Sequence, residues 1–519
     1  MQSSEILNLL GLDDLINVSP FGLYPISVYI PFGFFIFMTI STLLFTLAIR
    51  NYSYILALEL SKLLSILTCF YSAFLLVLPL FFLIKFRFES FTTLGGLFKL
   101  SPGVFLLQII IISIGIIALY ITNNSFFLNK QYYLEPNFLV SSIIFGSLCV
   151  FASNDLLSVF LTIELQTIPL VLLISFMPYN MKAVDAGIKY FVVSAISSSV
   201  LLFGLALWYF IFGITNFDFI GNLFFMINYH NLSIPSELPK TYKLLAILAV
   251  IFIIISLIIK LTAAPFHYWV LDIYNYSAIS SLLIFSVIPK LPLAIVLCNI
   301  FINIFNYDLF YSLAFNIILI IGLISVVVGT VGAFSQAKLT NILGFGSISH
   351  VGFILISMLC TKNLTIFITF VYLISYSINT LLFFNVWVNV MFDNKAVNYI
   401  NFLSGLAYRD IKTCLTLTIS LFSFSGLPPT LGFAAKLLVF IGLINNGAIF
   451  TACILFLLSL LSNVYYLRIV KIMWFENASD ILMVKALNTN LSVINWLLNL
   501  VLISLIIFGN LFAYLIMYF

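Results

Sequence analysis

Runs of about 20 consecutive apolar residues recur along most of this chain, and a bilayer core needs about 20 such residues for each crossing helix. Backbone groups in lipid must be satisfied within the segment, so each run is expected to be helical. The sequence therefore predicts an all-α polytopic membrane protein with about fourteen transmembrane helices. These lie near residues 26–48, 63–84, 104–122, 138–153, 155–177, 184–212, 242–272, 278–302, 310–334, 340–360, 364–392, 411–445, 447–469 and 490–518.

Composition excludes several other classes of protein. The chain is 63% hydrophobic and only 7% charged, which is far from the balance of a soluble globular domain. Its six cysteines are dispersed and none forms a CxxC pair, so we expect neither a disulfide framework nor a metal site. The net charge of +4 is scattered, and no basic run indicates binding of nucleic acid.

The N-terminal residues 1–20 are acidic rather than basic and show no Arg-rich amphipathic pattern. We therefore expect neither a secretory signal nor a transit peptide. Frequent Phe, Ile and Asn would suit an AT-rich genome, an organellar one included.

A charge inside an apolar segment costs roughly 2.5–3.5 kcal/mol on insertion scales, and six ionisable side chains of these segments are candidates for function. They are Glu164, Lys189, Lys260, Lys290, His350 and Lys436. A single buried carboxylate or histidine is as often structural as functional. Several lysines buried in one chain favour function, and we interpret the set as a proton path.

Glu164 and Lys189 lie on consecutive predicted spans. The glutamate is nine residues beyond Asp155, or about 13 Å along a helix, which is close to the middle of the membrane. Lys189 is just over one turn inside the next span, so its depth alone leaves a position at the membrane surface open. We predict that these two residues form an ion pair, because each is the natural partner of the other in the order of the chain.

Two of the lysines accompany predicted breaks in their helices. Lys260 precedes Pro265, and Lys436 follows the GLPP stretch that begins at Gly426. Proline removes a backbone donor and clashes with the preceding turn, so freed polar groups must find protein or water. Broken helices in separate halves of a chain are typical of inverted-repeat transporters. A repeat across roughly 138–302 and 310–470 is a hypothesis at this point, since the lysine precedes the proline in one half and follows it in the other.

Six stretches resemble one family in the right order. They are NDLLSVFLTIELQTIPL, KYFVVSAISSS, KLTAAPFHYWVLDIY, VIPKLPLAI, QAKLTNILGFGSISHVGFIL and FSFSGLPPTLGFAAKLLVF. Together they resemble the antiporter-like membrane subunits of NADH–quinone oxidoreductase (respiratory complex I), most closely the subunit 2 branch. The resemblance covers about residues 130–470. The stretch VLDIYNYSAIS departs from the usual loop of the family, which puts the conformation of that loop in doubt and not the lysines.

The resemblance implies a role for each buried ionisable group. Glu164 and Lys189 would be the charged pair near the subunit interface, and Lys260 the lysine of the first discontinuous helix. Lys290 would be the connecting lysine, His350 a histidine on the central hydrophilic axis, and Lys436 the terminal lysine of the second discontinuous helix.

A division of the chain follows from the same resemblance. Residues 1–137 would hold N-terminal helices, 138–302 and 303–470 two inverted five-helix half-channel repeats, and 471–519 a C-terminal helix.

The implied function is proton translocation in the membrane arm of complex I, driven by redox chemistry in other subunits. No cofactor is expected in this chain, whereas NADH, FMN, iron–sulfur clusters and ubiquinone are expected in partner subunits. The implied partners are the antiporter-like subunit 4, the small subunits 4L and 6, and membrane lipids, in the mitochondrial inner membrane. A free-standing cation/proton antiporter of the same superfamily is the alternative, and a structural subunit with vestigial charges is a further one.

Overall fold

The computed structural model describes residues 91–128, 135–176, 180–222, 240–303, 308–360, 365–388, 390–392, 395–396, 398–477 and 482–484, together with 495, 498–499 and 501. The predicted spans 26–48 and 63–84, and most of 490–518, lie outside the described residues. The described part of the chain contains most of the other predicted spans.

Long helices dominate this part of the chain. They are α5 (Pro102–Leu128), α6 (Glu135–Ala152), α7 (Leu156–Ile174), α8 (Met181–Phe212), α10 (Lys240–Lys260), α11 (Tyr268–Tyr276), α12 (Ile279–Val287), α13 (Lys290–Asn303), α14 (Asp308–Phe334), α15 (Leu339–Ser357), α16 (Thr365–Trp387), α17 (Leu406–Arg409), α18 (Ile411–Ser425), α19 (Leu431–Asn445) and α20 (Ile449–Phe475), with a 3-10 turn η1 (Ile400–Leu403). Among the described residues, nine helical spans are long and apolar enough to cross a membrane, and three shorter apolar helices accompany them. The prediction of an all-α polytopic membrane protein is therefore confirmed at this level.

Five short strands add to this helical architecture, and the sequence did not predict them. They are β1 (Phe91–Thr93), β2 (Phe98–Leu100), β3 (Val390–Phe392), β4 (Lys395–Ala396) and β5 (Leu482–Val484). Strands β1 and β2 form an antiparallel hairpin, and β3 pairs antiparallel with both β4 and β5. Each is too short to alter the fold class.

Helix boundaries follow local sequence signals. The turn between the predicted spans 138–153 and 155–177 is present, because the Asp155 carboxylate accepts a hydrogen bond from the backbone N–H of Leu157 and caps α7. The predicted span 242–272 ends as a helix at Lys260, and α11 resumes only after Pro265. The span 411–445 is likewise divided, since Gly426 adopts φ +83° and ends α18.

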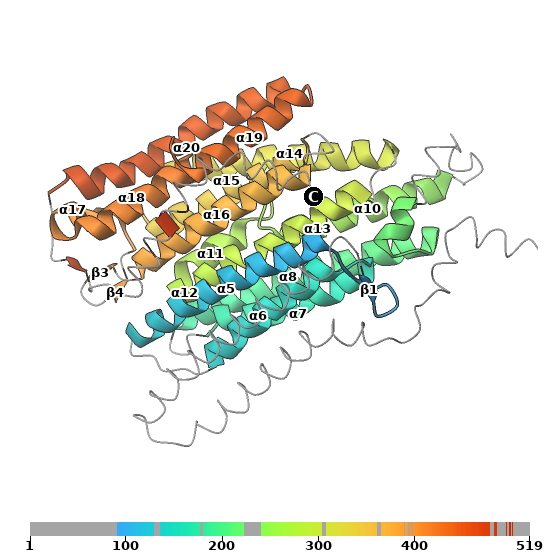
Figure 1. Cartoon of the computed structure of the whole chain (residues 1–519), viewed down its shortest axis with the longest axis horizontal. Helices are drawn as coiled ribbons and strands as arrows, with labels where there is room; N and C mark the ends of the chain where they lie inside the picture. Colours follow the sequence, from blue (N-terminus) through green and yellow to red (C-terminus); the bar gives the residue numbers. More distant parts are fainter. Residues whose placement is uncertain are drawn as a thin grey trace, which may run out of the picture.

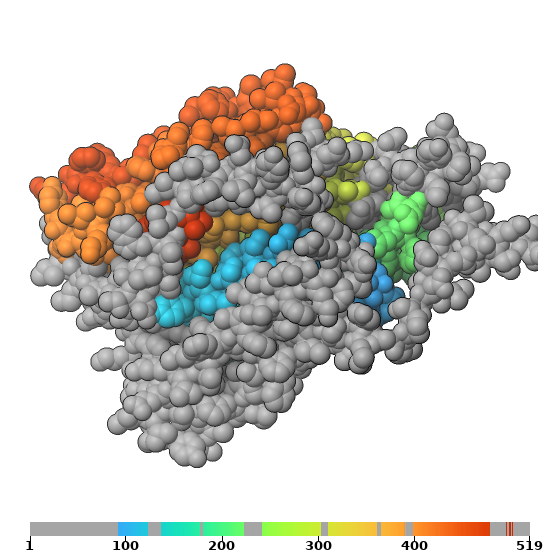
Figure 2. Space-filling view, viewed as in Figure 1, coloured from blue at the N-terminus to red at the C-terminus, as the bar shows by residue number. Residues whose placement is uncertain are grey.

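One span occupies the centre of the bundle. The apolar stretch Ile279–Ile302 contains α12 and nearly all of α13, and every residue from Ser280 to Cys298 is buried. It packs against α5, α6, α7, α10 and α16. In Figure 1 the helices α5–α8 lie on one side of this centre and α17–α20 on the other. The space-filling view shows the C-terminal helices along the upper edge of the same face, with α5 visible nearer its middle (Figure 2).

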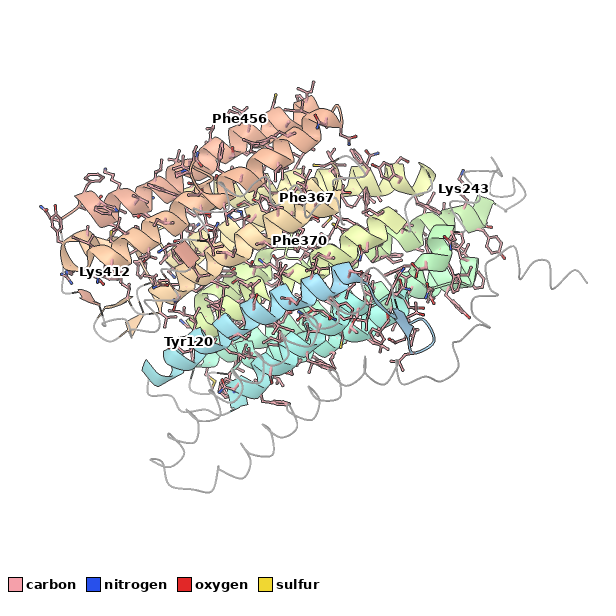
Figure 3. The ribbon with its side chains drawn as sticks, in the orientation of Figure 1. Tyr120, Lys243, Phe367, Phe370, Lys412 and Phe456 are labelled. Carbon is pink, nitrogen blue, oxygen red and sulfur yellow. The ribbon has the colours of Figure 1, made fainter. Side chains whose placement is uncertain are left out.

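The two broken helices run in opposite directions. Lys243 lies in the first turns of α10, and Lys412 lies at the start of α18. Figure 3 places these two lysines at opposite ends of the molecule. The chain therefore enters its first broken helix from one side of the bundle and its second from the other.

Candidate functional site

Glu164 and Lys260 form an ion pair between α7 and α10. The glutamate Oε1 and the lysine Nζ are 2.7 Å apart, and the Thr167 hydroxyl donates to Oε2 at 3.3 Å. The Lys260 side chain is 4% exposed and that of Glu164 is 28% exposed. The buried ammonium thus has an opposite charge beside it, while the carboxylate keeps contact with the outside of the described bundle.

Lys189 has a different partner from the one predicted. Its ammonium contacts the Asp272 carboxylate on α11 at 2.5 Å, with the two side chains 54% and 34% exposed. The predicted Glu164–Lys189 pair is wrong in this structure, because Glu164 is paired with Lys260. The physical reason is that α11 packs against α8 after the chain breaks, which brings Asp272 to Lys189. Order along the chain gave no sign of this packing.

The residues around Pro265 form a compact turn between α10 and α11. His267 precedes α11, and its Nδ1 lies 3.2 Å from the Pro265 carbonyl oxygen. Its ring also stacks on the ring of Tyr268 with centroids 4.6 Å apart. The histidine is therefore held within the turn.

Lys290 begins α13 in the middle of the central span. Its Nζ donates to the Tyr376 hydroxyl of α16 at 3.5 Å and lies 5.4 Å from the centre of the same ring. The side chain is almost fully buried. An aromatic ring face attracts a cation and becomes more effective when water is excluded. Tyr376 therefore offers Lys290 both an oxygen acceptor and a ring face.

His350 lies on α15 beside Tyr376, the residue that contacts Lys290. Its Nδ1 is 2.9 Å from the Tyr372 hydroxyl, and its ring lies beside those of Tyr376 and Phe424 at 5.3 and 5.5 Å between centroids. Its Nε2 is buried without a hydrogen-bond partner among the described residues.

Lys436 lies at the second helix break. Its Nζ donates to the carbonyl oxygens of Phe424 at 3.1 Å and Ser425 at 2.6 Å, and it lies 5.5 Å from the Phe353 ring. These carbonyls belong to the last turn of α18, where helical carbonyls lack intrahelical partners and the helix dipole is negative. The broken helix therefore supplies the oxygens that bind the ammonium.

Glycine is required at two positions of this break. A Cβ on Gly426 would lie 2.8 Å from Lys436 Cδ, and the residue has φ +83°. A Cβ on Gly432 would lie 1.7 Å from the Ser423 carbonyl oxygen. The absence of side chains at these positions lets α19 approach α18 closely enough for its lysine to reach the carbonyls.

The six predicted residues fall into three groups. Glu164 and Lys260 are in direct contact, and Lys189 lies apart from them with Asp272. The remaining three are joined in the order Lys290, Tyr376, His350, Phe424 and Lys436. Tyr376 links Lys290 to His350, the His350 ring lies beside that of Phe424, and the Phe424 backbone carbonyl accepts a hydrogen bond from Lys436.

The sequence reasoning missed two tyrosines and one aspartate. Tyr372 and Tyr376 are one helical turn apart in FVYLISYSINT, a spacing that puts their hydroxyls on one face of α16. That spacing could have identified them, as could the single carboxylate of Asp272 within VLDIYNY. The described residues contain no group of three or more His, Cys, Asp or Glu side chains that could hold a metal ion.

Comparison with known proteins identifies the family. The sequence model described as NADH:quinone oxidoreductase/Mrp antiporter, transmembrane, matches residues 153–462. The chain belongs to this family. All six predicted site residues lie within the matched region, and the resemblance noted in the sequence is confirmed.

Relatives in this family carry consistent names. The NADH-quinone oxidoreductase subunit N of Wolbachia sp. subsp. Brugia malayi is 32% identical over 65% of this chain and 69% of its own length. That of Pelagibacter ubique is 31% identical over 68% of this chain and 71% of its own. The NADH-ubiquinone oxidoreductase chain 2 of Rhizopus oryzae is 29% identical over 64% of this chain and 62% of its own.

Solved structures share the antiporter-like fold of the family. A chain of respiratory complex I from Thermus thermophilus superimposes with a TM-score of 0.71 at 20% identity, covering 91% of this chain and 98% of that one. A chain of the archaeal membrane-bound sulfane sulfur reductase gives a TM-score of 0.77 at 17% identity, covering 95% and 96%. At these identities the likeness concerns the fold.

Proposed function

We propose that this chain is the antiporter-like subunit 2 of a respiratory NADH:ubiquinone oxidoreductase and translocates protons through the membrane arm. Family membership and the names of the relatives support the assignment to this complex. The observation that carries the proton path is the buried series of contacts from Lys290 through Tyr376, His350 and Phe424 to Lys436. Burying several ionisable groups within the membrane-spanning helices costs free energy, and a role in proton transfer accounts for their presence.

The proposed fold of the whole chain has fourteen transmembrane helices. Residues 138–302 and 303–470 form two inverted five-helix repeats, preceded by N-terminal helices in 1–137 and followed by a C-terminal helix in 471–519. The opposite directions of the two broken helices support an inverted relation between the halves (Figure 3). In such transporters the binding sites lie where discontinuous helices expose their ends near the midplane.

The proposed path starts at Glu164. The carboxylate holds the Lys260 ammonium, and a change at Glu164 alters the electrostatic stabilisation of the Lys260 proton. The change in charge at Lys260 alters the proton affinity of Lys290. Lys290 then exchanges a proton with Tyr376 and His350, and the proton passes from them to Lys436. Lys189, which is paired with Asp272, modulates the first step of the path at Glu164. Loss or gain of a proton at one group changes the proton affinity of its neighbour, so the groups titrate as a coupled set.

Energy for transport comes from redox chemistry in partner subunits in this proposal. NADH, FMN, iron–sulfur clusters and ubiquinone belong to those subunits. The neighbouring membrane-arm partners are the antiporter-like subunit 4 and the small subunits 4L and 6. We place the chain in the mitochondrial inner membrane, which the frequent Phe, Ile and Asn of an AT-rich genome would suit, although its relatives include bacterial subunit N proteins as well as chain 2 of Rhizopus oryzae.

The test compares two lysine variants in the intact assembly. Lys260→Met removes the buried ammonium, whereas Lys412→Met removes an exposed lysine at the start of α18. Both are purified with the NADH-oxidising complex, reconstituted into vesicles and assayed for proton uptake for each NADH consumed. We expect proton transport to be lost in Lys260→Met and retained in Lys412→Met.

Two outcomes would contradict the proposal. Normal pumping in an assembled Lys260→Met complex would exclude the lysine from the path. Failure of the chain to migrate with an NADH-oxidising assembly, together with sodium–proton exchange by the isolated chain in vesicles, would establish the free-standing antiporter instead.

A further inference from the structure

Thr262 occupies a backbone position that usually belongs to glycine. Its φ is +68°, in the left-handed region that side chains branched at Cβ rarely adopt. The Thr262 N–H donates to the Ile259 carbonyl at 3.1 Å, and the Ala263 N–H donates to the Ile258 carbonyl at 3.3 Å. These two bonds form the Schellman turn that ends α10, with Thr262 where glycine is the common choice.

The hydroxyl of Thr262 has an unusual environment. The residue is 1% exposed, and its Oγ1 has no hydrogen-bond partner among the described residues. Threonines within helices of this chain behave differently, since the hydroxyls of Thr330 and Thr369 donate to carbonyls three and four residues earlier. Buried polar groups are satisfied by protein or by ordered water in almost every case. At Thr262 the described protein supplies no such partner.

Thr262 is two residues beyond Lys260, the lysine whose ammonium contacts Glu164. The Lys260 side chain is only 4% exposed although the residue as a whole is partly exposed, so its main chain is the accessible part. Backbone groups freed by a helix break in a membrane are tolerated where they meet protein or water. The unpartnered hydroxyl lies in the buried first part of this break, between the partly exposed Lys260 and the exposed Pro265 and Phe266.

We propose that Thr262 is a positioning residue whose hydroxyl binds the water molecule that takes the proton from Lys260. This inference rests on the proposed proton path. In the transfer, one N–H bond of the Lys260 ammonium breaks and the water gains that proton. The water then gives one of its own protons to the next carrier, and the threonine hydroxyl is unchanged. A strained threonine in place of glycine is explained by the need for this hydroxyl.

Three substitutions separate the hydroxyl from the backbone and from side-chain shape. Thr262→Ser keeps the hydroxyl, Thr262→Val keeps the branched shape without it, and Thr262→Gly removes it while relieving the backbone strain. Each variant is purified in the intact NADH-oxidising complex and reconstituted into vesicles. Proton uptake for each NADH consumed, thermal stability and the solvent deuterium isotope effect on proton uptake are measured.

The expected pattern distinguishes a role in proton transfer from a structural one. Thr262→Ser should retain transport, whereas Val and Gly should each slow it by about tenfold, less than the roughly hundredfold or more contributed by a direct proton carrier. The isotope effect should rise in the two slow variants, because transfer from Lys260 then limits the rate. Thr262→Gly should be at least as thermally stable as the parent chain, so its slow transport cannot be assigned to misfolding.

Normal transport in Thr262→Gly would overturn the inference, and so would equal slowing in Thr262→Ser and Thr262→Val. Lys260→Met, assayed beside them, keeps this failure separate from failure of the proposed function. If Lys260→Met abolishes transport while Thr262→Gly is normal, only the role of Thr262 is refuted. If Lys260→Met transports protons normally, the path itself is refuted.

Discussion

Substitution of Gly426 by alanine should disturb Lys436 through a single added carbon atom. The Cβ would lie 2.8 Å from Lys436 Cδ and 3.3 Å from Nζ, so the lysine side chain must move. That movement weakens the hydrogen bonds from Nζ to the carbonyls of Phe424 and Ser425. The perturbation therefore reaches the ammonium without removing it.

Two contributions to the loss of stability can be separated. A left-handed backbone conformation costs an L-residue about 1–2 kcal/mol. Hydrogen bonds involving a charged group contribute about 1.5–3 kcal/mol, of which a displaced lysine loses part. Gly447→Ala is the matched control, because Gly447 has φ +76° and an added Cβ meets nothing within 4 Å. The control should thus show the backbone contribution alone.

The assay measures thermal stability and proton uptake for each NADH consumed in the reconstituted complex. Both variants should lose stability, and Gly426→Ala should lose more. Only Gly426→Ala should slow proton transport, since a Cβ added at Gly447 meets none of the buried lysines. Equal transport by the two variants, in complexes that assemble equally well, would refute the view that the carbonyls of α18 hold Lys436 for proton transfer.

The ion pairs provide two further predictions. Glu164→Gln should abolish coupled proton transport and destabilise the complex by about 1–3 kcal/mol, because it leaves the Lys260 ammonium buried without its carboxylate. The double variant Glu164→Gln with Lys260→Met should regain stability but not transport; additive losses of stability in a double-mutant cycle would contradict direct coupling. Asp272→Asn should change stability by only about 0–1 kcal/mol, because the Lys189–Asp272 pair is exposed. It should nevertheless slow transport, because it leaves the Lys189 ammonium without its carboxylate partner. Asp272→Glu is the control, and a transport rate unchanged in Asp272→Asn would assign the pair a purely structural role.

The features that could be predicted from the sequence are those determined by residues that lie close together along the chain. Apolar length gave the class of fold, and Pro265 and the GLPP stretch gave the two broken helices. Their lysines are conspicuous because charge is rare in such segments. The chemistry of single residues within one helix can therefore be inferred from the order of the amino acids alone.

Partners across helices could not be predicted in the same way. Lys260 and Lys189 are both reasonable partners for Glu164, and only the contact between α7 and α10 and the packing of α11 against α8 decide between them. Tyr376 carries no charge that would single it out within its apolar segment, yet it contacts Lys290. The short strands depend on pairing between segments that are distant in sequence, as with β3 and β5.

The two broken helices stabilise their lysines with different kinds of oxygen. When Lys260 loses its proton, the negative carboxylate of Glu164 would remain beside a neutral amine. A proton leaving Lys436 leaves only neutral peptide dipoles behind, since its acceptors are the carbonyls of Phe424 and Ser425. Deprotonation of Lys260 is consequently opposed by the carboxylate beside it, whereas Lys436 can become neutral without leaving an unpaired anion in hydrocarbon. This asymmetry would favour release of the proton from Lys436.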